Sequence, residues 1–254
     1  MNETLKTIHS LRSTHGDFSE QEIARSDLET ILEACVRAAN ASARQSYAIV
    51  VVEDREMMKK LCGYAGSKAL LFCVDYNRII DTAAHLGYDF AADGVVPFVT
   101  ATIDTMLTAQ TAAIAARSLG IDSLFTNGVH RGDMNRVYEL LDLPKTHCFP
   151  LIMLVLGYAD QAPAPLKGRL SGAGVVHWGQ YHCPTPEELD ELVGQYDDPA
   201  AHLALSQDWR EQGMAHYLDW FYTVWSVRGG RREGRSQMCE VLEKAGFMEN
   251  VRDE

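Results

Sequence analysis

Short apolar runs alternate with amphipathic stretches along this chain of 254 residues. The runs lie at 47–52 (YAIVVV), 68–76 (KALLFCVDY), 121–129 (IDSLFTNGV) and 150–158 (PLIMLVLGY). Their length and their β-branched and aromatic content are typical of strands, and the unbroken run at 68–76 indicates burial on both faces. The third run ends in a turn signal, Asn127-Gly128. The pattern therefore predicts strands at all four places.

Helices are predicted beside and between these strands, at 4–12, 26–40, 55–62, 100–119 and 133–143. Two capping boxes, Ser19 with Glu22 and Ser26 with Glu29, indicate helix starts. Gly120 closes the long helix at 100–119. Pro144 stops the later helix at 133–143. Strands separated by helices of this length indicate an α/β or α+β layer structure with helices covering a sheet.

The composition changes after residue 158, and we divide the chain there into regions. Residues 159–174 are rich in Pro and Gly and predict an irregular excursion over the surface. We expect a main domain over 1–184 and an aromatic-rich helical extension over 185–228 that packs on this domain or on a partner subunit. A basic and then acidic tail is expected over 229–254.

Charge and cysteine content narrow the class of protein. The net charge of −12 argues against a general nucleic-acid surface or an anionic-membrane surface. No apolar run approaches the roughly 20 residues that span a bilayer, and the N-terminus lacks the order of a signal peptide. Six cysteines without a Cys-x-x-Cys pair, with Cys35 and Cys73 in apolar segments, indicate reduced core thiols and no metal site. We therefore expect a soluble cytoplasmic protein.

Three polar clusters could carry chemistry, and two of them are basic. They contain Arg12, Ser13, Thr14 and His15; Arg44, Gln45 and Ser46; and Lys167 and Arg169. Guanidinium and hydroxyl groups suit a phosphate, and Gly168 between the last two cations lets the backbone approach a ligand. If the first and third clusters converge, they form a cationic pocket for a small anionic ligand in an otherwise acidic protein.

Motifs of familiar enzymes are missing from the sequence. It contains no Gly-x-Gly-x-x-Gly after a strand, no phosphate-binding loop of the Walker type, no His-Glu-x-x-His and no Gly-x-Ser-x-Gly elbow. No side chain stands out as a nucleophile. A cofactor could therefore supply the chemistry.

Several segments, taken in order, resemble the FMN-dependent nitroreductase family of flavin oxidoreductases. They are LRSTHGDF, AANASARQSYAIVVVED, DTMLTAQTAAIAARSLGIDSLFTNGVHR, PLIMLVLGY, LKGRL and GVVHW. The resemblance implies an α+β, three-layer fold whose central, mainly antiparallel or mixed sheet is flanked by helices. It also implies an obligate homodimer with FMN at the subunit interface, bound by the 1–184 domain.

The resemblance also assigns residues to the cofactor. Arg12 and Ser13 fall in the motif that meets the FMN phosphate and ribityl chain, and Lys167 and Arg169 match the basic pair on the same phosphate. Gln45 and Ser46 lie in the loop beside the flavin, directly after Arg44. Thr126, Asn127 and Gly128 match the turn whose backbone passes the flavin N5 edge. No catalytic side chain or metal is implied, because flavin N5 carries the chemistry.

The chain departs from the family pattern at several positions. Ala43 replaces the loop asparagine, Ser46-Tyr47 replaces Pro-Trp, and His15 stands near the place of a Lys or Arg at the flavin's pyrimidine edge. If His15 lies there, its charge near neutral pH would make the flavin potential depend on pH.

The function implied is hydride transfer from NADH or NADPH and reduction of an electron-poor small molecule, such as a nitro compound or a quinone, by a ping-pong mechanism. Two alternatives stay open. One is an FMN-dependent reductase of another type, acting by dehalogenation or enone reduction. The other is an FMN-binding protein without NAD(P)H turnover.

Overall fold

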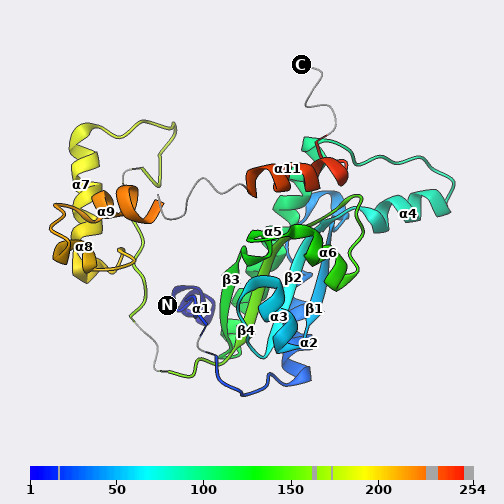
Figure 1. The fold of residues 1–254 in the computed structure, drawn as a ribbon, viewed down its shortest axis with the longest axis horizontal. Coiled ribbons are helices and arrows are strands. Elements are labelled where there is room, and N and C mark those ends of the chain that lie inside the picture. The colour runs from blue at the N-terminus through cyan, green and yellow to red at the C-terminus, as the bar shows by residue number, and fades with distance from the viewer. Residues whose placement is uncertain (17, 162–164, 173, 227–233, 249–254) are drawn as a thin grey trace. The chain divides into compact units, whose positions relative to one another are not determined.

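A four-stranded antiparallel sheet organises the larger of the two units into which the chain folds (Figure 1). In the computed structural model this unit comprises residues 1–162 and 233–254, and the second unit comprises residues 163–232. The structure describes all residues except 17, 162–164, 173, 227–233 and 249–254. The strand order is β1-β2-β4-β3. The strands are β1 (Tyr47–Val52), β2 (Lys68–Asp75), β3 (Asp122–Thr126) and β4 (Cys148–Gly157), as predicted.

The helices of this unit lie before, between and after the strands. They are α1 (Glu3–His9), α2 (Arg25–Cys35), α3 (Arg55–Cys62), α4 (Asn77–His85), α5 (Val95–Ser118), α6 (Met134–Leu141) and α11 (Gly234–Lys244), with the short 3₁₀ turns η1 (Ala41–Ala43) and η2 (Gly128–His130). None of the helices in the described residues combines the length and apolarity needed to cross a membrane.

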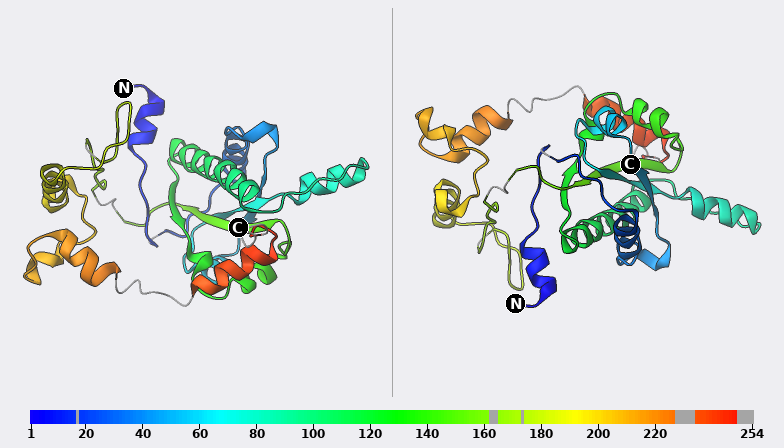
Figure 2. Two further views of the ribbon diagram at one scale, coloured as in Figure 1. Left: turned by 90° about the horizontal axis from the view of Figure 1, so that it is seen from above. Right: turned by 90° about the horizontal axis from the view of Figure 1, so that it is seen from below.

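The sheet lies between two helical layers (Figure 2). Strand β2 alternates its side chains between them: Leu70 and Phe72 pack in a core with α2 and α5, whereas Leu71 and Cys73 pack in a core with α3, α6 and α11. Successive side chains of a strand point to opposite faces, so two buried faces require an unbroken apolar sequence. The α+β class and the layered arrangement predicted from the sequence are thereby confirmed.

Helix α5 begins five residues earlier than predicted. It starts at Val95 and carries Pro97 in its first turn, where a missing N–H costs nothing because the first-turn amides have no partner inside the helix. The predicted end is confirmed: the helix stops at Ser118, and Gly120 follows with a φ of +76°. Its buried face consists mainly of alanine and threonine, which lets it pack closely on the sheet and on α2.

Both predicted capping boxes are wrong. Residues 19–24 form no helix, and α2 begins at Arg25 with Ala24 before it, so Ser26 lies within the helix. The Ser19 amide instead donates to the Tyr158 carbonyl over 2.8 Å. A hydrogen bond to a distant segment, at Tyr158, therefore takes the place of the capping box predicted from the Ser19–Glu22 spacing.

The last part of the chain contributes to the core of the first unit. Residues 234–244 form α11, and Val241, Ala245 and Phe247 are buried. The basic start of the tail predicted over 229–254 lies mostly outside the described residues, which omit 227–233. The division of the chain at 184 and 228 stays a prediction.

The second unit is helical and has a small aromatic core of its own. It contains α7 (Pro186–Asp197), η3 (Pro199–Ala201), α8 (Asp208–Glu211), α9 (Tyr217–Trp220) and the π-helical turn η4 (Phe221–Trp225). A Thr185–Glu188 capping box opens α7. Trp209, Tyr217 and Trp220 are buried together. Part of the predicted aromatic face is thus used inside this unit.

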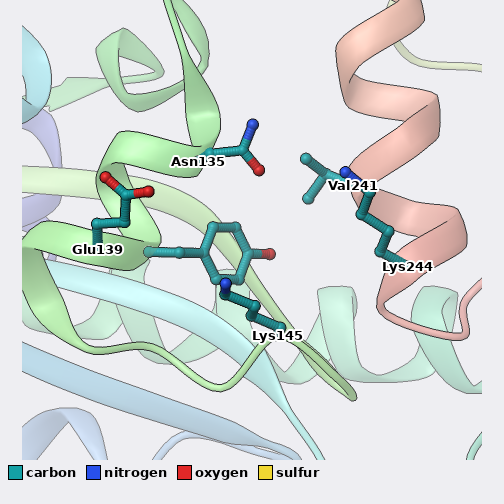
Figure 3. A pocket seen from close by; sticks show the side chains of 6 residues that line it. Asn135, Glu139, Lys145, Val241 and Lys244 are labelled. Carbon is teal, nitrogen blue, oxygen red and sulfur yellow. The ribbon is translucent and has the colours of Figure 1, made fainter.

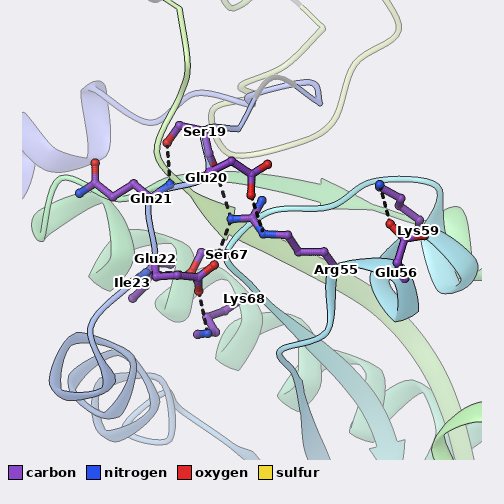
Figure 4. Close-up of polar contacts among 10 residues, drawn as sticks. All are labelled: Ser19, Glu20, Gln21, Glu22, Ile23, Arg55, Glu56, Lys59, Ser67 and Lys68. Atoms are coloured by element: carbon purple, nitrogen blue, oxygen red, sulfur yellow. Dashed lines mark hydrogen bonds and ion pairs between the residues drawn. The ribbon is translucent and has the colours of Figure 1, made fainter.

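A polar network centred on Glu22 joins the segment before α2 to β2 and α3 (Figure 4). Its carboxylate accepts hydrogen bonds from Ser67 Oγ at 2.8 Å, Lys68 Nζ at 2.9 Å and Arg55 Nη2 at 3.1 Å. The bonds from Lys68, Ser67 and Arg55 lower the pKa of Glu22 from 4.5 to about 2. The network holds the chain where the predicted capping box would have started a helix.

We predict that Glu22→Gln removes an acid-sensitive part of the stability. Because the folded-state pKa lies below the unfolded one, the ionised carboxylate stabilises the fold above about pH 4.5, and this contribution disappears as the pH falls towards about 2. The side chain is 56% exposed, so we expect a loss below about 1 kcal/mol. Urea midpoints at about pH 7 and pH 2.5 measure it.

The exposed Glu33→Gln serves as the control for loss of one negative charge. E22Q should lower the midpoint clearly at the higher pH, and the deficit should be much smaller at the lower pH. An equal deficit at both values would contradict the proposed role of the carboxylate charge.

Candidate functional site

The first polar cluster follows α1 and lies beside β3. Ser13 forms a parallel bridge with Ser123, and the Thr14 amide donates to the Ser123 carbonyl over 2.9 Å. Arg12 is half-buried, whereas Ser13 and His15 are exposed. The cluster is thus fixed by the backbone along one edge of the sheet and offers hydroxyl and imidazole groups to solvent.

The second cluster belongs to a strained loop, residues 40–46, that leads into β1. Ser42, Ala43 and Gln45 have φ values of 55°, 55° and 50°. This left-handed region is unfavourable for residues with a Cβ, at a cost of roughly 1–2 kcal/mol each. Three such residues in one loop persist only if the surroundings hold them.

Side chains from two other elements and from the loop itself hold this conformation. Asp104 Oδ1, on α5, accepts from the Ala41 amide at 2.8 Å. Asn40 Oδ1 accepts from the Gln45 amide at 3.2 Å. Arg78 Nη2, on α4, donates to the Gln45 carbonyl at 2.6 Å. The shape of the loop therefore depends on α4 and α5.

The surface that this loop offers to a ligand comes from Ala43, Arg44 and Gln45. Ala43 is exposed, and Arg44 and Gln45 are half-buried. The side-chain amide of Gln45 donates from Nε2 to the Tyr47 hydroxyl over 3.1 Å. Ser46 is fully buried, and its Oγ has no hydrogen-bond partner in the described part of the chain. Because Ser46 is buried, the groups of this loop that a ligand could contact belong to residues 43–45.

The turn after β3 is fixed by a close backbone approach. Thr126 Oγ1 accepts from the Gly128 amide at 3.0 Å. A Cβ on Gly128 would lie 2.3 Å from the Cys62 carbonyl oxygen, so only glycine fits against the end of α3. Asn127 is exposed at the tip. Nearby His130 is half-buried, 2.8 Å from the Pro150 carbonyl oxygen, and burial lowers its pKa.

The third cluster belongs to the second unit and is described within it. Lys167 Nζ donates to the Ala204 carbonyl over 2.6 Å, and Arg169 Nη1 donates to the backbone carbonyls of Lys167 and Gly168. A Cβ on Gly168 would lie 1.9 Å from the Ala201 carbonyl oxygen. Glycine is required here for packing between backbones, and both cations remain exposed.

The sheet puts the first cluster and the turn at the same edge but separates both from the loop. Ser13 and Thr126 lie beside or on β3, at one edge of the sheet, whereas the loop leads into β1 at the other edge. Across the sheet, Tyr47 on β1 pairs with Val74 on β2, and Val74 pairs with Phe149 on β4. Thr126 on β3 pairs with Met153, which lies four residues beyond Phe149 on β4. Strand spacing and residue rise put Tyr47 roughly 20 Å from Thr126.

Asp104 holds the loop, but it is not among the site residues predicted from the sequence. It is 1% exposed, and it is the single acidic residue in α5. A lone carboxylate on an otherwise apolar helix face is the signal that could have identified it, since buried carboxylates require hydrogen-bond partners.

A small cavity between α6 and α11 is not the ligand site. It has a volume of about 130 Å³ and is lined by Asn135, Tyr138, Glu139, Lys145, Val241 and Lys244 (Figure 3). The Tyr138 hydroxyl already donates to the Cys148 carbonyl over 2.9 Å, and burial raises the Tyr138 pKa. Sites for cofactor-sized ligands occupy roughly 300 Å³ or more.

Comparison with known proteins finds relatives that are named as flavin reductases. It is 33% identical over 189 residues to an NADPH-flavin oxidoreductase of Vibrio harveyi, covering 71% of this chain and 75% of that protein. It is 28% identical to an FMN reductase (NAD(P)H) of Bacillus subtilis, over 97% of this chain and 98% of the relative. No family model matches the chain.

A solved structure extends the similarity to the fold. Nitroreductase A from Vibrio parahaemolyticus superposes with a TM-score of 0.79 at 28% identity, covering 98% of this chain and 99% of that one. The chain belongs to the FMN-dependent nitroreductase family. The resemblance drawn from the ordered sequence segments is thereby confirmed. The roles assigned to individual residues of this nitroreductase-family chain stay predictions.

We predict that Asp104→Ala loosens loop 40–46. The Ala41 amide would lose a charged acceptor, and bonds to charged groups contribute roughly 1.5–3 kcal/mol. Amide exchange in the loop should therefore accelerate about tenfold or more. Hydrogen exchange followed by mass spectrometry measures this, with β2 peptides as the internal reference.

Asp104→Asn is the matched control, because its carbonyl oxygen can still accept from Ala41. Protection of the loop should be retained better in D104N than in D104A. Unchanged exchange in D104A would mean that the loop holds its strained conformation without this bond.

Proposed function

We propose that the protein is an FMN-dependent oxidoreductase that takes hydride from NADH or NADPH and reduces an electron-poor small molecule by a ping-pong mechanism. The observation that carries the proposal is the similarity to flavin and FMN reductases, which in one case covers nearly the whole of both chains. FMN would supply the hydride-accepting and electron-donating chemistry.

The residues present fit such a cofactor. In the first unit Arg12 is a cationic group suited to a phosphate, and Ser13 adds an exposed hydroxyl. Within the second unit, Lys167 and Arg169 are exposed cations of the same chemistry. Loop 40–46 and the turn at Gly128 present backbone and amide groups in conformations that the fold holds rigidly. These residues would bind and orient the cofactor.

The separation of the clusters supports a site shared between two copies of the chain. One copy puts Tyr47, directly after the loop, roughly 20 Å from Thr126, too far for one flavin ring to contact both. A second copy could bring its own loop to the β3 edge of the first. The proposed FMN site therefore lies at a homodimer interface.

An exposed apolar stripe on α5 supports the same dimer. Val96, Val99, Ile103 and Leu107 recur at spacings of three and four, and Val96 and Ile103 are 77% and 55% exposed. A helix face with this pattern marks an interface, because water penalises its exposure. The buried face of α5 contributes Asp104, the neighbour of Ile103 in sequence, and Asp104 holds the loop, so the interface helix and the loop are coupled.

We predict that the purified protein has the visible spectrum of a bound flavin and that NADH or NADPH bleaches it without air. Bleaching would identify both the cofactor and the electron donor. Persistent bands would favour an FMN-binding protein without NAD(P)H turnover. A colourless protein that takes up no added FMN would overturn the proposal.

We also predict that Ile103→Glu breaks the dimer and releases FMN, because it places a charge in the apolar stripe. Light scattering after gel filtration should report half the mass of the unmodified protein, and FMN affinity should fall at least tenfold. Gln21→Glu, which adds the same charge at an exposed loop position, is the control. A dimeric I103E would show that another surface forms the interface.

A further inference from the structure

A second cavity, of about 360 Å³, lies between the end of α3 and the start of α6. Its walls come from the last turn of α3, from η2 and the residues after it, and from the first turn of α6. The contact between Gly128 and the Cys62 carbonyl fixes two of these segments against each other. The volume is that of a small-molecule site.

The lining is strongly basic. Lysine and arginine make up 4 of the 12 residues that line the cavity, against 23 of the 254 in the chain. They are Lys59, Lys60, Arg131 and Arg136. In a chain with a net charge of −12, such a concentration at one cavity creates a local positive field.

Three of the four cations have no ion-pair partner within the described residues. Lys59 pairs with Glu56 at 2.8 Å, whereas Lys60, Arg131 and Arg136 form no salt bridge there. Asp133, the one acidic residue in the lining, accepts from the Asn135 amide at 3.0 Å and from Gln237 Nε2 at 2.7 Å. The carboxylate is therefore occupied in capping α6 and tying it to α11.

Arg131 lines the cavity and lies near Cys62 at the end of α3. Burial raises the pKa of the Cys62 thiol, and the positive charge of Arg131 partly opposes this rise. Cys62 and Arg131 both line the cavity, on different elements, so the guanidinium lies near the end of α3. An arginine that lines the cavity supplies a planar fork of hydrogen-bond donors.

We propose that this cavity binds a small molecule through a phosphate or pyrophosphate group. Two guanidinium groups from one short segment can each donate two hydrogen bonds to phosphate oxygens, and Lys60 adds a point charge from the opposite wall. Leu61, Val129 and Val137 give the cavity an apolar part that suits the carbon skeleton of the ligand. The group is either part of a nicotinamide coenzyme or part of a separate phosphorylated compound.

The cavity is distinct from the residues assigned to FMN, with one exception. Gly128 belongs both to the turn assigned to the flavin and to the cavity lining. The inference goes beyond the proposed function and stands on the cavity residues alone.

The test titrates the purified full-length protein with pyrophosphate and with adenosine 2′,5′-bisphosphate, by calorimetry at low salt. We expect saturable binding that weakens about tenfold in Arg131→Gln and in Arg136→Gln, and further in the double variant, because charged hydrogen bonds are lost. Arg37→Gln, on an exposed position outside the cavity, is the control and should bind like the unmodified protein.

The outcomes separate the two sources of the phosphate. A higher KM in R131Q for NADPH alone would identify the 2′-phosphate of the coenzyme, and a higher KM for both NADPH and NADH would identify their shared pyrophosphate. An unchanged KM for both coenzymes would identify a separate compound. Absence of pyrophosphate and bisphosphate binding, or equal weakening in R37Q, would overturn the proposal. Binding needs no turnover, so a protein that fails to hold FMN can still pass this test.

Discussion

Burial of β2 on both faces is the constraint on which the rest of the structure depends. The strand has antiparallel neighbours on both sides, so its backbone groups are paired within the sheet and its side chains can enter two cores. One core holds α2 and α5, and the other holds α3, α6 and α11. Polar residues at its ends, Lys68 and Asp75, mark where the strand leaves these cores. Helix positions on both sides follow from this one element.

The same sheet distributes the candidate site. Antiparallel order β1-β2-β4-β3 puts the loop before β1 and the turn after β3 at opposite edges. A single chain therefore exposes two separate sets of candidate ligand-binding groups. The strain in loop 40–46 is maintained by α5, the helix that also exposes an apolar stripe. A partner on this helix would thus bear directly on the geometry of the loop, which connects assembly to ligand binding.

Some basic residues in the described part of this acidic chain are paired with carboxylates, and others gather at a cavity without them. Around Glu22, Arg55 and Lys68 are neutralised by carboxylates within hydrogen-bond distance, and their role is to join segments. At the cavity between α3 and α6, Lys60, Arg131 and Arg136 have no such carboxylates in the described residues. Cations kept together without counter-charges repel one another, and an anionic ligand would relieve this repulsion.

The sequence by itself determined the four strands, the main helices, the α+β class and the family, because periodicity and motif order are local properties of the chain. It also located the polar clusters. The capping box at Ser19 failed because Ser67, Lys68 and Arg55, 33 to 46 residues away in sequence from Glu22, bind its carboxylate more favourably than a local cap does. The role of Asp104, the separation of the loop from the turn, and the basic cavity depend on which distant segments the sheet brings together. Only tertiary structure decides such pairings, since no local pattern encodes the register of β4 against β3 or the approach of Gly128 to Cys62.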